Sequence, residues 1–264
     1  MQKRHLNRIQ YFEEQEFTTL RYVIPFIEKF RKIEAGMKIL EIGCGEGGNL
    51  KPFLERRCEV TGIDLSEYKI NLARSFFNNL PLTGHPELIA EDVYNLPSPE
   101  VKYDLVIMRD VIEHIHDQKK FMAFVQQFLH DESLFFLAFP PWQNPFGGHQ
   151  QICKNKILGA LPYFHLLPSC CYRLLLKSGG ESEATIGNLL EVKETGLSIE
   201  RFQKIVETSG FQILSKRYYF INPNYEIKFG IKPVRQSRLI GGIPWLRNFL
   251  TTSVFFLLSP CGKH

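Results

Sequence analysis

Long apolar segments are absent from this sequence. No uninterrupted apolar run in its 264 residues reaches the roughly 18–20 residues that a membrane-spanning helix needs. Residues 243–258 come nearest, but Pro244, Arg247 and Asn248 interrupt them. The amino-terminal residues also have no apolar core of the length found in signal peptides. We therefore expect a protein without a transmembrane segment.

Paired cysteines and a strong charge of one sign are lacking as well. The six cysteines form no CxxC pair and have no histidine spacing suited to zinc, so we expect reduced thiols in a cytoplasmic protein. With 32 basic and 28 acidic residues, the net charge of +4 is too small to indicate a nucleic-acid partner. The length suits a single domain, 1–264, with insertions, and no internal repeat divides it.

What the sequence does contain is a glycine-rich turn between two short apolar runs. Residues 37–42 suit a buried strand, and the turn GCGEGG follows at 43–48. Residues 49–57 have helical spacing, and the second apolar run, 58–63, ends in Asp64. This order of strand, turn, helix, strand and acidic residue is typical of a nucleotide site on a parallel sheet, where Asp64 can accept both hydroxyls of a ribose.

The residues beside the turn bear on which nucleotide binds. Gly43, Gly45 and Gly48 match GxGxxG, so a nicotinamide or flavin dinucleotide is one candidate. Glu41 and Glu46, however, would repel a pyrophosphate and would suit a nucleoside that carries positive charge, as S-adenosylmethionine does. We expect the helix to open near Glu46 and to point its free N–H groups at the same place.

Residues 41–47 and 60–66 resemble the first and second motifs of the class I S-adenosylmethionine-dependent methyltransferases, in the small-molecule branch similar to methyltransferase types 11 and 12. The similarity continues to about residue 139. It implies S-adenosylmethionine as cofactor, S-adenosylhomocysteine as product, and a helical cover at 1–35 in which Tyr11 or Tyr22 touches the methionine end. The cofactor-binding residues that it implies are Tyr11, Glu41, Gly43, Cys44, Gly45, Gly47, Asn49, Asp64, Leu65, Ser66, Asp92, Val93, Arg109 and Asp110.

The remaining pattern predicts a doubly wound α/β fold with a seven-stranded, mostly parallel sheet. We expect the strand order 3-2-1-4-5-7-6, with further strands at 87–90, 103–108, 133–139, 211–221 and 252–258. Helices are expected after the N-cap Ser66, at 118–130 and after the N-cap Ser198. The resemblance places Asp92 at the end of the third strand, where it would accept a hydrogen bond from the adenine amino group; the alternative is a solvated turn.

Two segments, 140–196 and 222–250, are too long to be simple connections. We expect both to fold over the active site as helical lids. Their aromatic and basic residues indicate an apolar pocket with a basic rim, suited to an apolar acceptor with an anionic part or to peripheral membrane contact. The alternative is that the aromatic residues only form a core for the insertions.

Catalytic residues are harder to identify, because methyl transfer needs a base only when the nucleophile must lose a proton. His149, which follows two glycines, and His114 are candidate general bases; each has a purely structural role as its alternative. Asp92, Asp104, Asp110 and Asp117 have no spacing that specifies a metal, so we expect no metal site.

These observations favour methyl transfer to a small-molecule acceptor, with O-methylation ahead of N- or C-methylation and a lipid, quinone or glycan precursor as acceptor. One alternative is an S-adenosylmethionine-binding module without turnover. Another is a nicotinamide-dependent oxidoreductase, but the Tyr-x-x-x-Lys pair typical of such enzymes is absent. Residues 139–142, FPPW, resemble the N/D-P-P-Y/F motif of DNA methyltransferases but lack its polar first residue and follow the fifth strand, which excludes that function. The oligomeric state is left open.

Overall fold

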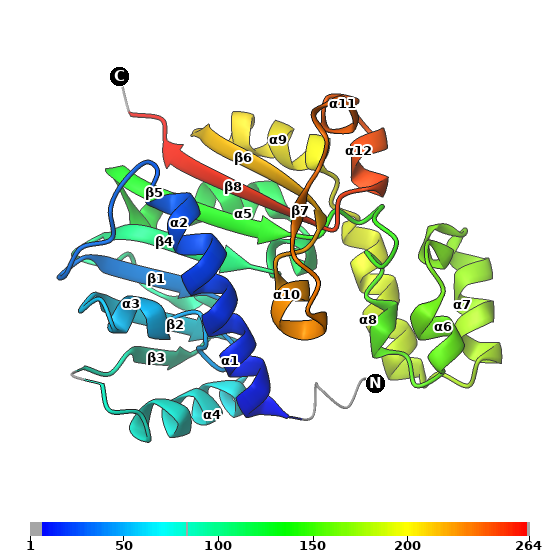
Figure 1. The fold of residues 1–264 in the computed structure, drawn as a ribbon, viewed down its shortest axis with the longest axis horizontal. Helices are drawn as coiled ribbons and strands as arrows, with labels where there is room; N and C mark the ends of the chain where they lie inside the picture. The colour runs from blue at the N-terminus through cyan, green and yellow to red at the C-terminus, as the bar shows by residue number, and fades with distance from the viewer. Residues whose placement is uncertain (1–6, 83, 263–264) are drawn as a thin grey trace.

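The computed structural model describes residues 7–82 and 84–262, and within them a single sheet of eight strands lies at the centre (Figure 1). β1 to β5 run parallel, whereas β8 is antiparallel to both β5 and β6. In spatial order the strands are β3 (Glu87–Ala90), β2 (Glu59–Asp64), β1 (Lys38–Ile42), β4 (Tyr103–Arg109), β5 (Leu129–Phe139), β8 (Ser253–Pro260), β6 (Phe211–Ile221) and β7 (Val234–Arg235).

The doubly wound α/β fold and its strand order are confirmed, because β8 inserts between β5 and β6 as the order 3-2-1-4-5-7-6 requires. The predicted number of strands is wrong. An eighth strand, β7, pairs with β6 at the edge of the sheet. It has only two residues, both exposed, and is therefore too short to leave an alternating pattern in the sequence.

Helices cover both faces of the sheet, and each face has its own apolar cluster. The alternation along β1 separates them: Ile39 joins the cluster that includes Phe12 and Phe53, while Leu40 and Ile42 join the other. One face is covered by α1 (Arg8–Thr18), a π-helical turn (Thr19–Val23), α2 (Ile24–Ile27), α3 (Lys51–Leu54) and α4 (Glu67–Asn78). The other is covered by α5 (Gln118–Val125) and α9 (Ile199–Thr208).

The predicted start of the first helix after the glycine turn is wrong. The chain stays in a non-helical turn from Gly43 to Leu50, and α3 is one turn long, with Pro52 among its first residues. Gly43, Gly45 and Gly47 all have positive φ angles (75°, 56° and 83°), and a left-handed backbone cannot continue into a right-handed helix.

The helix expected at 118–130 is also shorter than predicted. α5 ends at Val125, a single 3-10 turn follows, and β5 begins at Leu129 rather than at residue 133. Leu129 pairs with Tyr103 of β4, so the neighbouring strand extends β5 toward its amino end. By contrast, the predicted N-caps Ser66 and Ser198 are confirmed, since each side chain accepts a backbone N–H bond from the residue three positions on.

The two insertions leave the sheet at its carboxyl edge and are themselves largely helical (Figure 1). The first contains α6 (Lys156–Ala160), α7 (Ser169–Ser178) and α8 (Glu183–Thr195), packed around a separate apolar cluster that includes Phe164, Tyr172 and Leu189. The second contains α10 (Asn224–Phe229), β7, α11 (Arg238–Gly241) and α12 (Leu246–Phe249). Within the described residues, none of these helices is long and apolar enough to cross a membrane.

Candidate active site

A cavity of about 620 Å³ opens at the carboxyl ends of β1, β2, β3 and β4. Its size falls within the range of small-molecule sites, and its place is where parallel sheets bind ligands. Most of the residues expected to bind the cofactor line it: Tyr11, Gly43, Gly45, Asp64, Leu65, Ser66, Asp92, Val93, Arg109 and Asp110. His114, one of the two candidate bases, lines it as well.

The glycine turn forms one wall of the cavity. A Cβ atom on Gly43 would lie 2.3 Å from Cγ2 of Val111, so this position has no room for a side chain. Gly45 has open space around it, and its N–H donates a hydrogen bond of 2.9 Å to Oδ2 of Asp64. The turn thus presents bare backbone to the cavity and is tied to the end of β2.

Asp64 is held in place by backbone donors. Besides the bond from Gly45, its Oδ1 atom accepts a 2.9 Å hydrogen bond from the N–H of Ser66, and the ammonium of Lys69 lies 3.9 Å from Oδ2. A carboxylate can accept about four hydrogen bonds, so capacity for two ribose hydroxyls remains. The side chain is therefore fixed before any ligand arrives.

Glu41, Asn49 and Arg109 form a buried network behind the cavity wall. Asn49 donates a 2.6 Å hydrogen bond to Oε1 of Glu41 and accepts one of 2.5 Å from the Arg109 guanidinium. The same guanidinium donates to Thr19 Oγ1 (3.0 Å) and to Asn224 Oδ1 (3.2 Å). Burial raises the pKa of Glu41 to about 8, although Asn49 and Arg109 oppose the shift.

This network still has unused hydrogen-bonding capacity. Among the described residues, Oε2 of Glu41 and Nε of Arg109 are buried atoms without a hydrogen-bond partner. Asn49 and Arg109 also line a second, small cavity of about 60 Å³ together with Tyr11, and Asn224 belongs to the second insertion. A polar ligand entering here could satisfy these groups.

The other predicted residues fall into two groups. Asp92 caps a 3-10 turn (Val93–Asn95) by accepting the N–H of Tyr94 at 3.0 Å, and both Asp92 and Val93 face the cavity. Cys44 and Gly47 do not line it: the Cys44 thiol is fully buried, and a Cβ atom on Gly47 would meet the Phe77 ring at 2.7 Å. Their place is in the packing beneath the turn.

Helix α1 lies along the cavity and closes part of it. Tyr11 and Gln15 line the wall, and Arg8 forms an ion pair of 2.8 Å with Glu46 of the glycine turn. Burial raises the pKa of the Tyr11 hydroxyl. Tyr22, the alternative to Tyr11, does not line the cavity; its hydroxyl donates to the carboxylate of Glu226 in α10.

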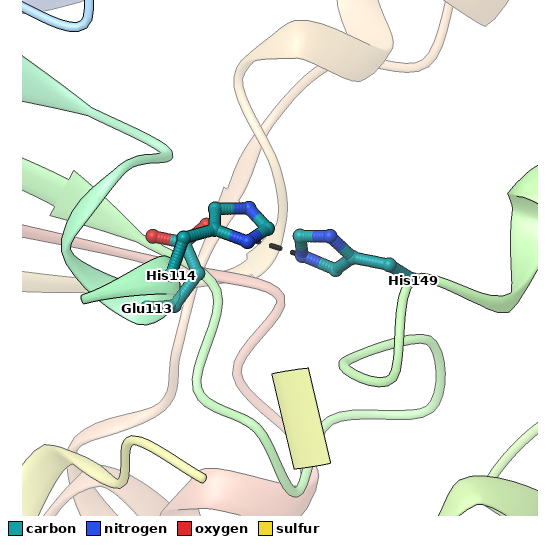
Figure 2. Close-up of side chains that lie close together, drawn as sticks. All are labelled: Glu113, His114 and His149. Atoms are coloured by element: carbon teal, nitrogen blue, oxygen red, sulfur yellow. Dashed lines mark ion pairs between the residues drawn. The ribbon is translucent and has the colours of Figure 1, made fainter. Parts of the chain in front are cut away.

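His114 and His149 come together from distant parts of the chain. Their ring centroids are 5.0 Å apart at an angle of 68°, an edge-to-face arrangement, and Figure 2 shows the two side chains pointing toward each other near Glu113. His149 belongs to the first insertion, whereas Glu113 and His114 belong to a 3-10 turn (Ile112–His114) after β4. Desolvation lowers the pKa of His114 and lowers that of His149 to about 4, so both rings are neutral at pH 7.

Comparison with known proteins assigns the chain to a family. Residues 12–156 match the model of a family described as a methyltransferase domain, which is more than half of the chain. The chain belongs to the methyltransferase family. This confirms the resemblance to a methyltransferase family found in the sequence.

Individual relatives of this methyltransferase are distant. The (S)-tetrahydroprotoberberine N-methyltransferase of Eschscholzia californica is 30% identical over 108 residues, which is 40% of this chain and 30% of that protein. The ubiquinone biosynthesis O-methyltransferase of Acinetobacter baylyi is 22% identical over 241 residues, covering 86% of this chain and 90% of the relative. In the first curated matches, this methyltransferase covers less than half of the relative's own length.

Among solved structures, the magnesium protoporphyrin IX methyltransferase of Synechocystis with bound S-adenosylhomocysteine superimposes with a TM-score of 0.55 at 17% identity. The match covers 96% of this methyltransferase and 84% of that chain. At such low identity the likeness shows the shared fold.

Sequence reasoning missed several residues that the structure brings to the site. Glu113, Thr19 and Asn224 are not among the residues predicted from the sequence. Thr19 and Asn224 lie 90 and 115 positions from Arg109, so no spacing rule connects them. A signal for Glu113 did exist, because the sequence places it directly before His114.

Proposed function

We propose that this protein transfers the methyl group of S-adenosylmethionine to a hydroxyl oxygen of a small, apolar acceptor such as a quinone or lipid precursor. The observation that carries the proposal is the 620 Å³ cavity, in which the glycine turn, Asp64, Asp92 and Arg109 meet at the carboxyl edge of the sheet. The name ubiquinone biosynthesis O-methyltransferase, which several relatives carry, supports oxygen as the methylated atom.

The residues present fit the cofactor. The bare backbone at Gly43 leaves room that a Cβ atom would fill, Asp64 retains acceptor capacity for a ribose, and the unpartnered Oε2 of Glu41 suits a ligand group that can hydrogen-bond to it. The cofactor supplies a methyl group whose bond to sulfur breaks as a bond to the acceptor oxygen forms, with loss of the acceptor's proton and release of S-adenosylhomocysteine. In this proposal Asp64 holds the ribose, Asp92 and Val93 the adenine, and Glu41 the charged end through its buried network.

The chain's role in the reaction is then mainly to position the reactants and exclude water. Well-oriented reactants can gain on the order of 7–11 kcal/mol from positioning alone. His114 lines the cavity as a neutral imidazole and is placed to accept the acceptor's proton. Helix α1, through Tyr11 and Gln15, shields the same space from solvent.

The second insertion supports an apolar acceptor. It leaves Trp245 and Leu239 62% and 84% exposed, close in sequence to the basic residues Arg238 and Arg247. Asn224 at its start reaches the cavity region through Arg109. We propose that 222–250 guides a lipid-like acceptor toward the site, from a membrane surface or from solution, in a cytoplasmic protein whose cysteines are all free thiols.

Calorimetric titration with S-adenosylhomocysteine tests the cofactor assignment, with NAD as the competing ligand. We expect micromolar binding of S-adenosylhomocysteine alone, weakened about 100-fold in Asp64→Ala because hydrogen bonds to a charged group contribute about 1.5–3 kcal/mol each. Asp131→Ala, a change at an exposed aspartate of β5, is the matched control and should bind like the wild type.

Transfer of labelled methyl from S-adenosylmethionine to a panel of hydroxylated aromatics, amines and carbon acids then tests the acceptor. Label on a hydroxylated aromatic would support O-methylation. Label only on amines would contradict it, and NAD binding in the first experiment would overturn the whole proposal. Tight S-adenosylhomocysteine binding without transfer to any acceptor would favour a binding module instead.

A further inference from the structure

We propose that Glu113, His114 and His149 form a binding site for a divalent transition-metal ion, beside the cofactor cavity. The existence of the site is argued from the geometry of the three side chains alone. Only the role of the ion rests on the proposed function. It revises the expectation from the sequence that no metal site exists.

The three side chains offer the right donors at nearly the right distances. One ligand atom from each, two imidazole nitrogens and a carboxylate oxygen, can be chosen so that all lie within 4.8 Å of one another. Donors bound to a tetrahedral zinc ion at about 2.0–2.1 Å lie about 3.3 Å apart. Small rotations of side chains that already face each other, as Figure 2 shows, would close the difference.

Glu113 is the strongest indication that something positive belongs here. Its side chain is 4% exposed, yet neither carboxylate oxygen has a hydrogen-bond partner among the described residues. Nε2 of the neutral His149 ring is 3.9 Å from Oε1, which is too long for a hydrogen bond. A buried carboxyl group without a partner costs stability unless a ligand satisfies it.

The backbone holds both halves of the site in place. Thr195 of α8 donates a 2.5 Å hydrogen bond to the carbonyl of Glu113, which fixes the turn against the first insertion. His149 has a left-handed backbone (φ 56°, ψ 22°), and a Cβ atom on the preceding Gly148 would meet His165 at 2.4 Å. Non-glycine residues adopt this strained conformation mainly where the surrounding structure requires it, often at functional sites.

The donor set indicates the class of ion. Two imidazoles and one carboxylate suit Zn²⁺, Fe²⁺, Co²⁺ or Mn²⁺, whereas Ca²⁺ and Mg²⁺ prefer all-oxygen sites. Three protein ligands also leave open coordination positions, as in catalytic metal sites. Because His114 lines the cavity, an acceptor bound there could fill those positions.

A metal at this place would change the role of His114 from base to ligand. The ion would lower the pKa of an acceptor hydroxyl bound to it, as it does for bound water, so that the proton leaves to solvent before the oxygen attacks the methyl carbon. An acceptor with two neighbouring oxygens, such as a catechol, would chelate the ion and have one oxygen fixed near the cofactor. The acceptor class that the site favours is therefore a vicinal dihydroxy aromatic.

Titration of the chelator-treated full-length protein with Co²⁺, followed by visible absorption, tests the site. We expect one Co²⁺ per chain with bands typical of nitrogen and oxygen ligands, displaced by Zn²⁺, and affinity at least about tenfold weaker in Glu113→Gln and in His149→Gln. His116→Gln is the matched control: it removes an exposed histidine two positions from His114 and should bind as the wild type does.

S-adenosylhomocysteine binding, measured on the same samples, separates the two proposals. Glu113→Gln and His149→Gln should keep wild-type affinity for S-adenosylhomocysteine, which also shows that they are folded. No stoichiometric Co²⁺ binding by the wild type, or equal loss of binding in His116→Gln, would overturn the metal site while leaving the methyltransferase assignment intact. Co²⁺ binding without any S-adenosylhomocysteine binding would instead remove the proposed function and keep the site.

Discussion

Replacing Glu41 by glutamine should make the protein more stable at alkaline pH. Glu41 is fully buried, and desolvation raises its pKa from 4.5 to about 8 against the opposing effects of Asn49 and Arg109. The folded protein therefore binds a proton that the unfolded chain releases. The contribution of Glu41 to stability is fully present below pH 4.5 and is lost as the pH rises toward 8.

The size of the effect follows from the two pKa values. Between pH 5 and pH 8 the ionisation of Glu41 in the unfolded chain removes about 3.5 kcal/mol from the free energy of unfolding. Glu41→Gln keeps an oxygen for the 2.6 Å hydrogen bond from Asn49 but cannot ionise. We expect the melting temperature of the variant, relative to wild type, to rise by on the order of 5–10 °C from pH 5 to pH 8.

Thermal unfolding of wild type and Glu41→Gln at several pH values measures the difference between their melting temperatures. The other titrating groups are the same in both proteins, so their contributions cancel in this difference. Glu59→Gln, a change at an exposed glutamate of β2, shows what the loss of a carboxylate does at the surface. A gap between Glu41→Gln and wild type that stays constant with pH would refute the reasoning. It would mean that Glu41 is ionised in the folded protein and paired with Arg109.

Two further predictions concern packing. Gly43→Ala should destabilise the protein by about 1–3 kcal/mol and weaken S-adenosylhomocysteine binding, because its Cβ atom would meet Val111 at 2.3 Å. Adding Val111→Ala should restore part of the stability and part of the binding, as measured by calorimetry in a double-mutant cycle. Strictly additive effects of the two substitutions would contradict the clash. Leu189→Ala, in the cluster of the first insertion, should lower the free energy of unfolding by about 2–5 kcal/mol. It should speed hydrogen exchange in α6 to α8 and leave the affinity for S-adenosylhomocysteine unchanged. Faster exchange in β1 as well would show that the core of the insertion and the core of the sheet unfold together.

The sheet was largely predictable because its signals are local. The strand at Glu59–Asp64 is an apolar run ending in an acidic residue. Ser66 predicts the start of the next helix because its side chain can cap it. The resemblance to methyltransferase motifs implied Asp92 and Arg109 as site residues beside Asp64, and the structure brings all three to one cavity, where the carboxyl ends of neighbouring parallel strands meet.

The predictions that failed depend on contacts between distant parts of the chain. The start of α3 at Lys51 is set by three left-handed glycines, whose φ angles the sequence does not reveal. β7 exists because β6 offers it an edge. His149 lies 35 positions from His114, so only the fold of the first insertion shows that they face one another with Glu113.

The separate apolar cluster of the first insertion has a consequence for how such an enzyme can diverge. Leu189, Tyr172 and Phe164 are buried among themselves, outside the two clusters that flank the sheet. Substitutions among them can reshape the segment without disturbing the packing beneath the glycine turn. This segment can therefore diverge, or be exchanged as a whole between relatives, while the two clusters that hold the glycine turn and its cavity stay unchanged.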